Sequence, residues 1–174
     1  MILTDYFIKR KVRRLARETG NRNHCFRSLK EAHDILVFYE GKNLEEIEPC
    51  LETLRMLRKN VRACVYVAVE APADFPESYV LLNKVKDLTV FGFPKEEVIK
   101  KVNAVKADIL IDLTGKGCAP MRYLMLQHPS AFKIGLKRGY EQDMYDFSLS
   151  VTDRNDMKYL FGQIIFYLQT IRGK

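Results

Sequence analysis

Short apolar runs alternate with amphipathic stretches along most of the chain. Residues 34–39, 63–69 and 108–113 are almost continuously apolar, which is typical of strands buried on both faces of a parallel sheet. Apolar residues recur every three or four positions over 44–57 and 95–105, which predicts a helix in each stretch. A strand, a helix and a second strand at this spacing predict a right-handed parallel crossover.

The alternation continues to the end of the chain and contains one weaker stretch. Residues 71–77 hold two prolines, after which we expect a short helix over 79–85 and a short third strand over 88–91. The remaining expected elements are a helix over 118–127, strands over 132–136 and 145–151, and a closing helix over 155–171. We therefore predict an α/β fold with a three-layer, Rossmann-like, doubly wound and mostly parallel sheet of about six strands, covered by helices on both faces.

A separate amphipathic segment precedes the first strand. Ile8, Val12 and Leu15 recur at helical spacing over residues 6–18, with basic residues around the rest of the helix. The sequence Gly-Asn-Arg-Asn over 20–23 predicts the end of this helix, because Gly and Asn readily take the left-handed conformation. We expect two parts, a basic amphipathic N-terminal helix over 1–22 and a single Rossmann-like α/β domain over 23–174.

The positive charge of the chain is concentrated in its first 30 residues. These carry nine cations and two anions, whereas the remainder carries 20 of each, so the formal net charge of +7 lies in this segment. Attraction to phosphate, in nucleic acid or in lipid head groups, is therefore expected there. The candidate polyanion-binding residues are Lys9, Arg10, Lys11, Arg13, Arg14 and Arg17.

The same helix admits a purely structural interpretation. Its apolar stripe could pack on the sheet or on a partner subunit while the cations stay solvated. Tyr6 and Phe7 lie just before the cations, but no aromatic residue is interleaved with them, so a stacking platform for single-stranded RNA is not predicted.

Two glycine loops are candidates for a ligand site. If the strands follow the common 3-2-1-4-5-6 order, the ligand crevice lies between strands one and four. The loops after those strands each place a lysine beside a glycine and precede a helix, whose free N–H groups favour anions. A glycine after a strand equally forms a tight turn without any ligand. The crevice candidates are Glu40, Gly41, Lys42, Asn43, Asp112, Thr114, Gly115, Lys116 and Gly117.

The reactive side chains near these loops do not predict catalysis. Asp112 suits a general base or a hydroxyl acceptor, but a carboxylate there equally accepts N–H groups of its own loop. The helix dipole favours the thiolate of Cys118. His128 lies about 15 Å further along the helix axis, which excludes a Cys–His nucleophile pair. We assign no catalytic residues.

The sequence contains no cofactor or metal motif. It lacks G-x-x-x-x-G-K-[ST] and G-x-G-x-x-G, and its four cysteines form no C-x-x-C pair. We therefore expect no cofactor and no metal. The order of charged and apolar residues at the start is the reverse of a secretory signal, and no apolar run is long enough to span a membrane, so we expect a cytoplasmic protein with reduced thiols.

Two stretches of the chain resemble a known enzyme family. Residues 107–115 (Ala-Asp-Ile-Leu-Ile-Asp-Leu-Thr-Gly) and 132–136 (Phe-Lys-Ile-Gly-Leu) resemble the N-terminal half of heptosyltransferase-type glycosyltransferases of the GT-B fold, in which a D-x-x-x-D-L strand leads to a helix and an R-I-G strand. Residues 41–49 are similar to that family's first loop and helix. The whole chain is also similar to an uncharacterised family of small bacterial proteins, which implies no activity.

Two departures argue against a complete glycosyltransferase. The family places an acid after the glycine of its first loop, whereas Lys42 and Asn43 follow Gly41 here, so the base that the resemblance implies is missing. The second GT-B domain, which binds most of the sugar nucleotide, is expected to be missing too, because only one helix is predicted after Val151.

Two functional hypotheses follow. In the first, the chain is a non-catalytic binding or adaptor module, a GT-B-like half domain whose basic N-terminal helix contacts a polyanion (RNA or a membrane surface) or a protein partner. In the second, an enzyme or sensor binds a phosphorylated or sugar-like ligand at the switch point of the sheet, through Lys42, Lys116, Gly115 and Asp112.

Overall fold

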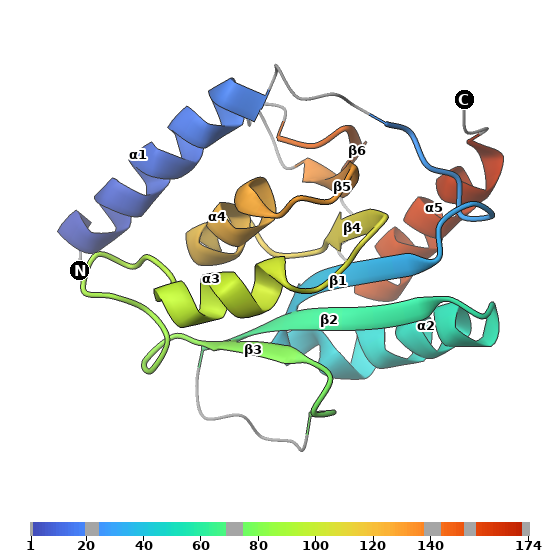
Figure 1. Ribbon diagram of the computed structural model, residues 1–174, viewed down its shortest axis with the longest axis horizontal. Helices are drawn as coiled ribbons and strands as arrows, with labels where there is room; N and C mark the ends of the chain where they lie inside the picture. Colours follow the sequence, from blue (N-terminus) through green and yellow to red (C-terminus); the bar gives the residue numbers. More distant parts are fainter. Residues whose placement is uncertain (1, 20–24, 69–74, 138–143, 152–155, 172–174) are drawn as a thin grey trace.

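The computed structural model describes residues 2–19, 25–68, 75–137, 144–151 and 156–171 (Figure 1). Helices and strands alternate through these residues. In chain order they are α1 (Ile2–Glu18), β1 (Asp34–Glu40), the single 3₁₀ turn η2 (Gly41–Asn43), α2 (Leu44–Met56), β2 (Asn60–Val67), β3 (Val80–Asn83), α3 (Glu96–Asn103), β4 (Ile109–Asp112), α4 (Ala119–Gln127), β5 (Phe132–Lys137), β6 (Phe147–Ser150) and α5 (Met157–Thr170).

The six strands form one sheet in the order β3-β2-β1-β4-β5-β6, and every neighbouring pair is parallel. This confirms the predicted α/β Rossmann-like fold and the assumed strand order. The chain moves outward from β1 to β3 and then returns to the centre at β4, so the strand order reverses between β1 and β4.

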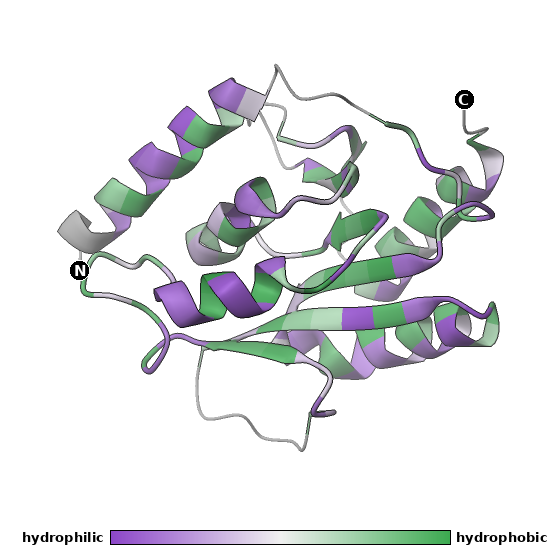
Figure 2. Cartoon of the chain, viewed as in Figure 1, coloured by the Kyte–Doolittle hydropathy of each residue, from purple (hydrophilic) through white to green (hydrophobic). Residues whose placement is uncertain are grey.

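Helices cover both faces of the sheet (Figure 1). Alternate residues of β1 point to opposite faces: Ile35, Val37 and Tyr39 belong to the hydrophobic cluster under α2 and α5, whereas Leu36 and Phe38 belong to the cluster under α3 and α4. Because both faces are covered, the central strands are apolar along most of their length (Figure 2).

Helix α1 packs against α4 as an additional outer layer (Figure 1). Ile8, Val12 and Ala16 are buried and belong to the same hydrophobic cluster as α3 and α4. The predicted stripe is thus confirmed for Ile8 and Val12, while Leu15 is half-buried at its margin. The predicted helix end over 20–23 lies outside the described residues, and a boundary at residue 22 stays a prediction.

Two predicted elements are wrong, the short helix over 79–85 and the strand over 88–91. The third strand is Val80–Asn83, where a short helix is expected from the sequence, and residues 88–91 form no strand of the sheet. The strand ends at Asn83 because its side-chain oxygen accepts the N–H groups of Val85 and Lys86, while its own N–H donates to the carboxylate of Asp87. The other elements lie where they are predicted, with ends shifted by at most four residues.

Candidate functional site

The carboxyl ends of β1 and β4 bring the two glycine loops into direct contact. The N–H of Gly115, in the loop after β4, donates to Oε1 of Glu40, the last residue of β1, over 2.7 Å. Oε2 of the same carboxylate lies 2.8 Å from Nζ of Lys42. The predicted crevice residues from the two loops are therefore neighbours in space, although 75 positions separate Glu40 from Gly115.

The Glu40 carboxylate occupies the hydrogen-bond donors that an anionic ligand would otherwise use. Its side chain is 17% exposed and takes both the loop N–H of Gly115 and the ammonium group of Lys42. A phosphate at this point would have to displace the carboxylate or bind beside its negative charge. The remaining loop candidates contribute less: Lys116 and Gly117 are exposed, and Asn43 stands at the N-cap of α2 without a side-chain hydrogen bond to the helix.

Asp112 lies at the end of β4 and is completely buried. Its Oδ1 accepts the N–H of Thr114 at 2.9 Å and the hydroxyl of Thr114 at 2.6 Å. Its Oδ2 accepts the hydroxyl of Tyr145 at 2.9 Å. Burial raises the pKa of Asp112, and the Thr114 hydrogen bonds oppose that shift. Of the two alternatives drawn from the sequence, the geometry agrees with a carboxylate that organises its own loop.

Tyr145 reaches Asp112 across the backbone of Gly135. Asp112 and Gly135 are partners in the β4–β5 register, and the Tyr145 ring lies directly over this glycine. A Cβ atom added at Gly135 would come within 2.2 Å of the ring. The glycine of the Ile-Gly stretch in β5 is thus required by a close tyrosine contact, which gives this part of the predicted resemblance a local packing reason.

Cys118 and His128, at opposite ends of α4, are both unsuited to nucleophilic catalysis. Burial raises the pKa of the Cys118 thiol to about 12, which outweighs the helix dipole and corrects the predicted thiolate. Burial lowers the pKa of His128 to about 4. The Nδ1 atom of His128 accepts the N–H of Ser130 at 3.1 Å, and Nε2 lies 2.9 Å from the carbonyl oxygen of Val105, so the neutral ring donates there.

The second candidate surface is the solvent side of α1. We call its six cations the basic face: Lys9, Arg10, Lys11, Arg13, Arg14 and Arg17. All are exposed except the half-buried Lys11, because the opposite side of the helix is covered by α4. Arg10, Arg13 and Arg17 follow one another at helical spacing and form a row about 10 Å long.

Only two cations of the basic face have a carboxylate neighbour on α1. Lys9 lies 3.4 Å from Asp5, and Arg14 lies 3.4 Å from Glu18. Both pairs are exposed and therefore weak. Within the described parts of the chain, Arg10, Arg13 and Arg17 form no ion pair. Tyr6 and Phe7 line one surface hollow of about 710 Å³ together with the basic face.

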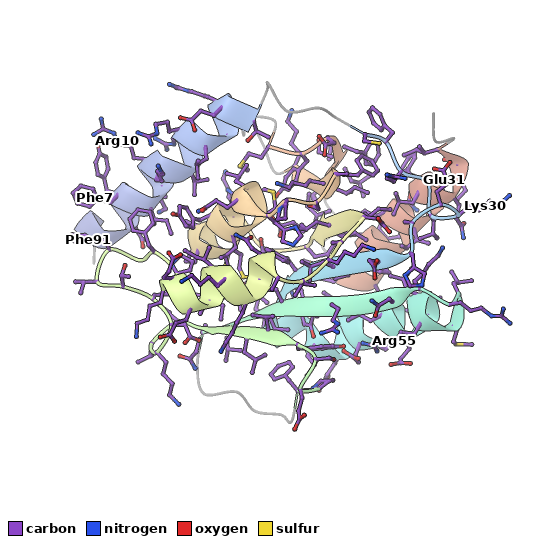
Figure 3. The ribbon with its side chains drawn as sticks, viewed as in Figure 1. Phe7, Arg10, Lys30, Glu31, Arg55 and Phe91 are labelled. Carbon is purple, nitrogen blue, oxygen red and sulfur yellow. The ribbon has the colours of Figure 1, made fainter. Side chains whose placement is uncertain are left out.

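At the start of this surface the fold gives Tyr6 and Phe7 apolar neighbours that the sequence does not reveal. The loop between β3 and α3 brings Phe91 to Phe7, with ring centroids 5.5 Å apart (Figure 3). Tyr6, Phe7, Val90 and Phe91 are all exposed, and we call these four residues the apolar tip. In the sequence these residues form Thr-Val-Phe-Gly over 89–92. We interpret residues 88–91 as a strand because Val and Phe favour strands, although the glycine that follows is equally typical of a turn.

The described residues carry no feature of a metal centre or a membrane span. Among them no three His, Cys, Asp or Glu side chains gather in a way that could hold a metal ion. No helix that the structure describes combines the length and the apolar character needed to cross a bilayer. The four cysteines are free, and three of them are buried.

The fold and these two surfaces define a small α/β protein built on one parallel sheet, with an extra basic helix on its outer layer. The chain belongs to DUF6913, a family of unknown function that matches residues 5–171. No curated protein and no solved structure matches the chain. The predicted similarity to an uncharacterised family is thus confirmed, while the resemblance to GT-B glycosyltransferases finds no support among known proteins.

Proposed function

We propose that the protein is a non-catalytic binding or adaptor module that holds a polyanion on the basic face of α1. One observation carries this proposal: Arg10, Arg13 and Arg17 form an exposed row with no carboxylate partner in the described residues. Guanidinium groups bind phosphates through paired hydrogen bonds. A row of them without internal partners offers these donors to a ligand.

The packing of α1 supports the same function. Because Ile8, Val12 and Ala16 are buried in the core cluster under α4, the helix is fixed in orientation and its cations point away from the sheet. A preformed array of charges loses less conformational entropy on binding than a flexible basic tail does. Such a surface recognises the negative charge of its partner and not a particular sequence. This is consistent with a binding or adaptor module that performs no chemistry.

The test is a binding titration with fluorescently labelled heparin at several salt concentrations. We expect an affinity that falls steeply with salt, because binding releases counterions from the polyanion. Replacing Arg10, Arg13 and Arg17 by Gln should weaken binding by at least about tenfold. A matched control replaces Lys30, Lys101 and Lys158 by Gln, which also removes three positive charges, but from exposed positions outside α1. Lys30 lies at the far end of the molecule (Figure 3). Equal losses in the two variants, or no binding by the natural protein, would overturn the proposal.

A ligand at the switch point is the second candidate function. It is favoured by the direct contact of the two lysine-bearing loops through Glu40 and Gly115. In this proposal a phosphorylated or sugar-like ligand contacts Lys42 and Lys116. The resemblance of residues 107–115 and 132–136 to the N-terminal half of a GT-B glycosyltransferase supports the sugar-like class, but the acid after Gly41 is missing. Thermal-shift screening with nucleotide sugars and sugar phosphates tests it, since saturating ligand at about 100 times Kd adds about 2.7 kcal/mol.

We also propose that the protein works in the cytoplasm of a bacterium. What supports the compartment is the state of its cysteines: four free thiols, none of them in a disulfide, suit a reducing environment. Cell fractionation with an antibody against the protein tests this location.

A further inference from the structure

A tight turn presents two large apolar side chains to solvent beside the basic face. The N–H of Gly92 donates to the carbonyl oxygen of Thr89 at 2.9 Å, which makes Val90 and Phe91 the two central residues of the turn. Gly92 has a φ of 78°, a conformation that glycine adopts without strain. The N–H of Thr89 donates to the carbonyl oxygen of Phe93 at 2.8 Å and closes the loop a second time. The apolar pair is therefore held in place by the backbone.

Val and Phe are unusual residues for the centre of a solvent-exposed turn. Central turn positions favour Gly, Pro, Asn, Asp and Ser. Here Val90 is 82% exposed and Phe91 is 55% exposed, and Tyr6 and Phe7 beside them are 54% and 44% exposed. Four exposed apolar side chains gathered next to charged residues are typical of an interaction surface.

The apolar tip and the basic face form one continuous surface. Phe7 contacts Phe91 and Tyr6, with ring centroids 5.5 Å and 5.8 Å apart, so the turn and the helix are joined. The same hollow is lined by Tyr6, Phe7 and the cations that follow on α1. Figure 3 shows Phe7, Phe91 and Arg10 along one edge of the molecule. A ligand that covers the arginine row therefore also meets apolar side chains at one end.

The arrangement of the rings favours lipid over nucleic acid. Both ring pairs are edge-to-face, with interplanar angles of 79° and 75°, so the cluster is not a set of parallel faces on which successive bases stack. Val90, the most exposed member, has no ring at all. Compact aliphatic and aromatic side chains beside Lys and Arg are instead the combination by which peripheral proteins insert into an anionic membrane interface.

We propose that the apolar tip and the basic face together bind an anionic lipid surface. The tip enters the interface between head groups and acyl chains, and the arginine row contacts the lipid phosphates. This inference rests on the proposed polyanion-binding function and names its partner. The buried stripe of Ile8, Val12 and Ala16 stays on α4, so α1 lies on the membrane through its charged side and is not itself inserted.

The first experiment measures co-sedimentation of the full chain with two kinds of vesicle, phosphatidylcholine alone and phosphatidylcholine mixed with phosphatidylserine. We expect binding to the anionic vesicles only, since each cation near such a surface adds attraction and zwitterionic lipid offers none. Val90→Asn with Phe91→Asn should weaken vesicle binding by about tenfold or more, because it removes the inserted apolar groups. It should leave the heparin affinity within about twofold, because the charges remain.

A matched control replaces two equally exposed apolar residues elsewhere. Met56 on α2 is 82% exposed and Phe166 on α5 is 58% exposed, close to the values of Val90 and Phe91, and both lie on helices that cover the other face of the sheet. Met56→Asn with Phe166→Asn should keep vesicle binding unchanged. The far-ultraviolet circular dichroism of each variant establishes that it is folded.

The second experiment uses the absence of tryptophan from the sequence. In Phe91→Trp the only indole stands at the tip, so anionic vesicles should shift its emission to the blue and brominated lipid should quench it. In Met56→Trp the indole should show neither effect. An unshifted Trp at position 91, or vesicle binding unaffected by Val90→Asn with Phe91→Asn, would overturn the lipid proposal.

The outcomes separate this inference from the function on which it rests. Binding to heparin but not to vesicles would refute the lipid surface and leave the polyanion-binding function standing. If single-stranded RNA binds more tightly than vesicles and its affinity falls in the tip variant, the partner is nucleic acid and the inference is wrong. Failure to bind heparin, RNA and anionic vesicles alike would refute both.

Discussion

The switch-point edge of the sheet and the outer side of α1 both gather polar groups, but they satisfy them differently. At the sheet edge Glu40 takes the N–H of Gly115 and the charge of Lys42, and Asp112 takes three donors. On α1 the arginine row finds no carboxylate among the described residues, and apolar side chains next to it remain exposed. The polar groups of the predicted crevice are thus satisfied largely by each other. The groups that face solvent without partners are the ones available to a ligand.

Among substitutions at the sheet edge, Gly135→Ala should cause the largest loss of stability. The added Cβ would lie 2.2 Å from the Tyr145 ring, so the ring must move and its hydrogen bond to the buried Asp112 is lost. Overpacking and a lost buried hydrogen bond together should lower the free energy of unfolding by about 3 kcal/mol or more. Urea denaturation measures the change. Gly117→Ala is the control, because nothing lies within 4 Å of its added Cβ; a comparable loss there would contradict the packing explanation.

The protein should lose stability at acidic pH because of the buried His128. The pKa of His128 is about 4 in the folded protein and about 6.5 when unfolded, so the unfolded chain binds more protons between these values. The contribution of His128 to the free energy of unfolding is therefore fully present above about pH 6.5. It is lost as the pH falls toward 4, by about 2–3 kcal/mol in total. Denaturation curves at several pH values measure the slope. His128→Gln should flatten it between pH 4 and 6.5, and an unchanged slope in that variant would assign the acid sensitivity to other groups.

Tyr145→Phe is a smaller change at the same place. It removes one hydroxyl that donates to Oδ2 of Asp112 and leaves the ring over Gly135 in place. The free energy of unfolding should fall by about 1–2 kcal/mol, because a buried acceptor loses its donor. Heparin affinity should be unchanged, since the substitution removes no charge and changes no residue of the basic face. A large loss of heparin binding in this variant would mean that the two surfaces are coupled.

The smallest expected effect belongs to Lys42→Ala combined with Lys116→Ala. The Lys42 side chain is 69% exposed, so its ion pair with Glu40 contributes at most about 0.5 kcal/mol. Urea denaturation should show little change, and heparin affinity should stay within about twofold of the natural protein. If the switch point binds a sugar phosphate, this variant is the one that loses the ligand-induced thermal shift. A retained shift would exclude these lysines from that site.

Elements defined by neighbouring residues can be predicted from the sequence, whereas contacts between distant residues cannot. The buried strands around Val37 and Ile111 are evident because both of their faces are covered, and their parallel pairing follows from the alternation of strands and helices. The order of the strands is assumed from a common arrangement. Val80–Asn83 is missed because a run of three apolar residues before Asn83 fits a helix as well as a strand. The side-chain caps that end it at Asn83 depend on Asp87, which the apolar pattern does not reveal.

The candidate sites show the same division. The basic face is contained in one helix, and its residues are evident from charge and period alone. The partner of Asp112 is Tyr145, 33 positions away, and Phe7 meets Phe91 across 84 positions, so neither pairing is encoded by a nearby motif. Gly135 offers the one clue, since a glycine inside a buried strand often marks a close approach by another group.

The turn at Thr89–Gly92 also has a consequence for rates. Its two backbone hydrogen bonds and the contact of Phe91 with Phe7 fix the apolar tip before any encounter, so binding does not wait for a loop to fold. Association should then be governed by diffusion and by the field of the cations, whereas the lifetime of the complex depends on how firmly Val90 and Phe91 are held. Salt would act mainly on arrival at the surface, and changes at the tip mainly on departure from it.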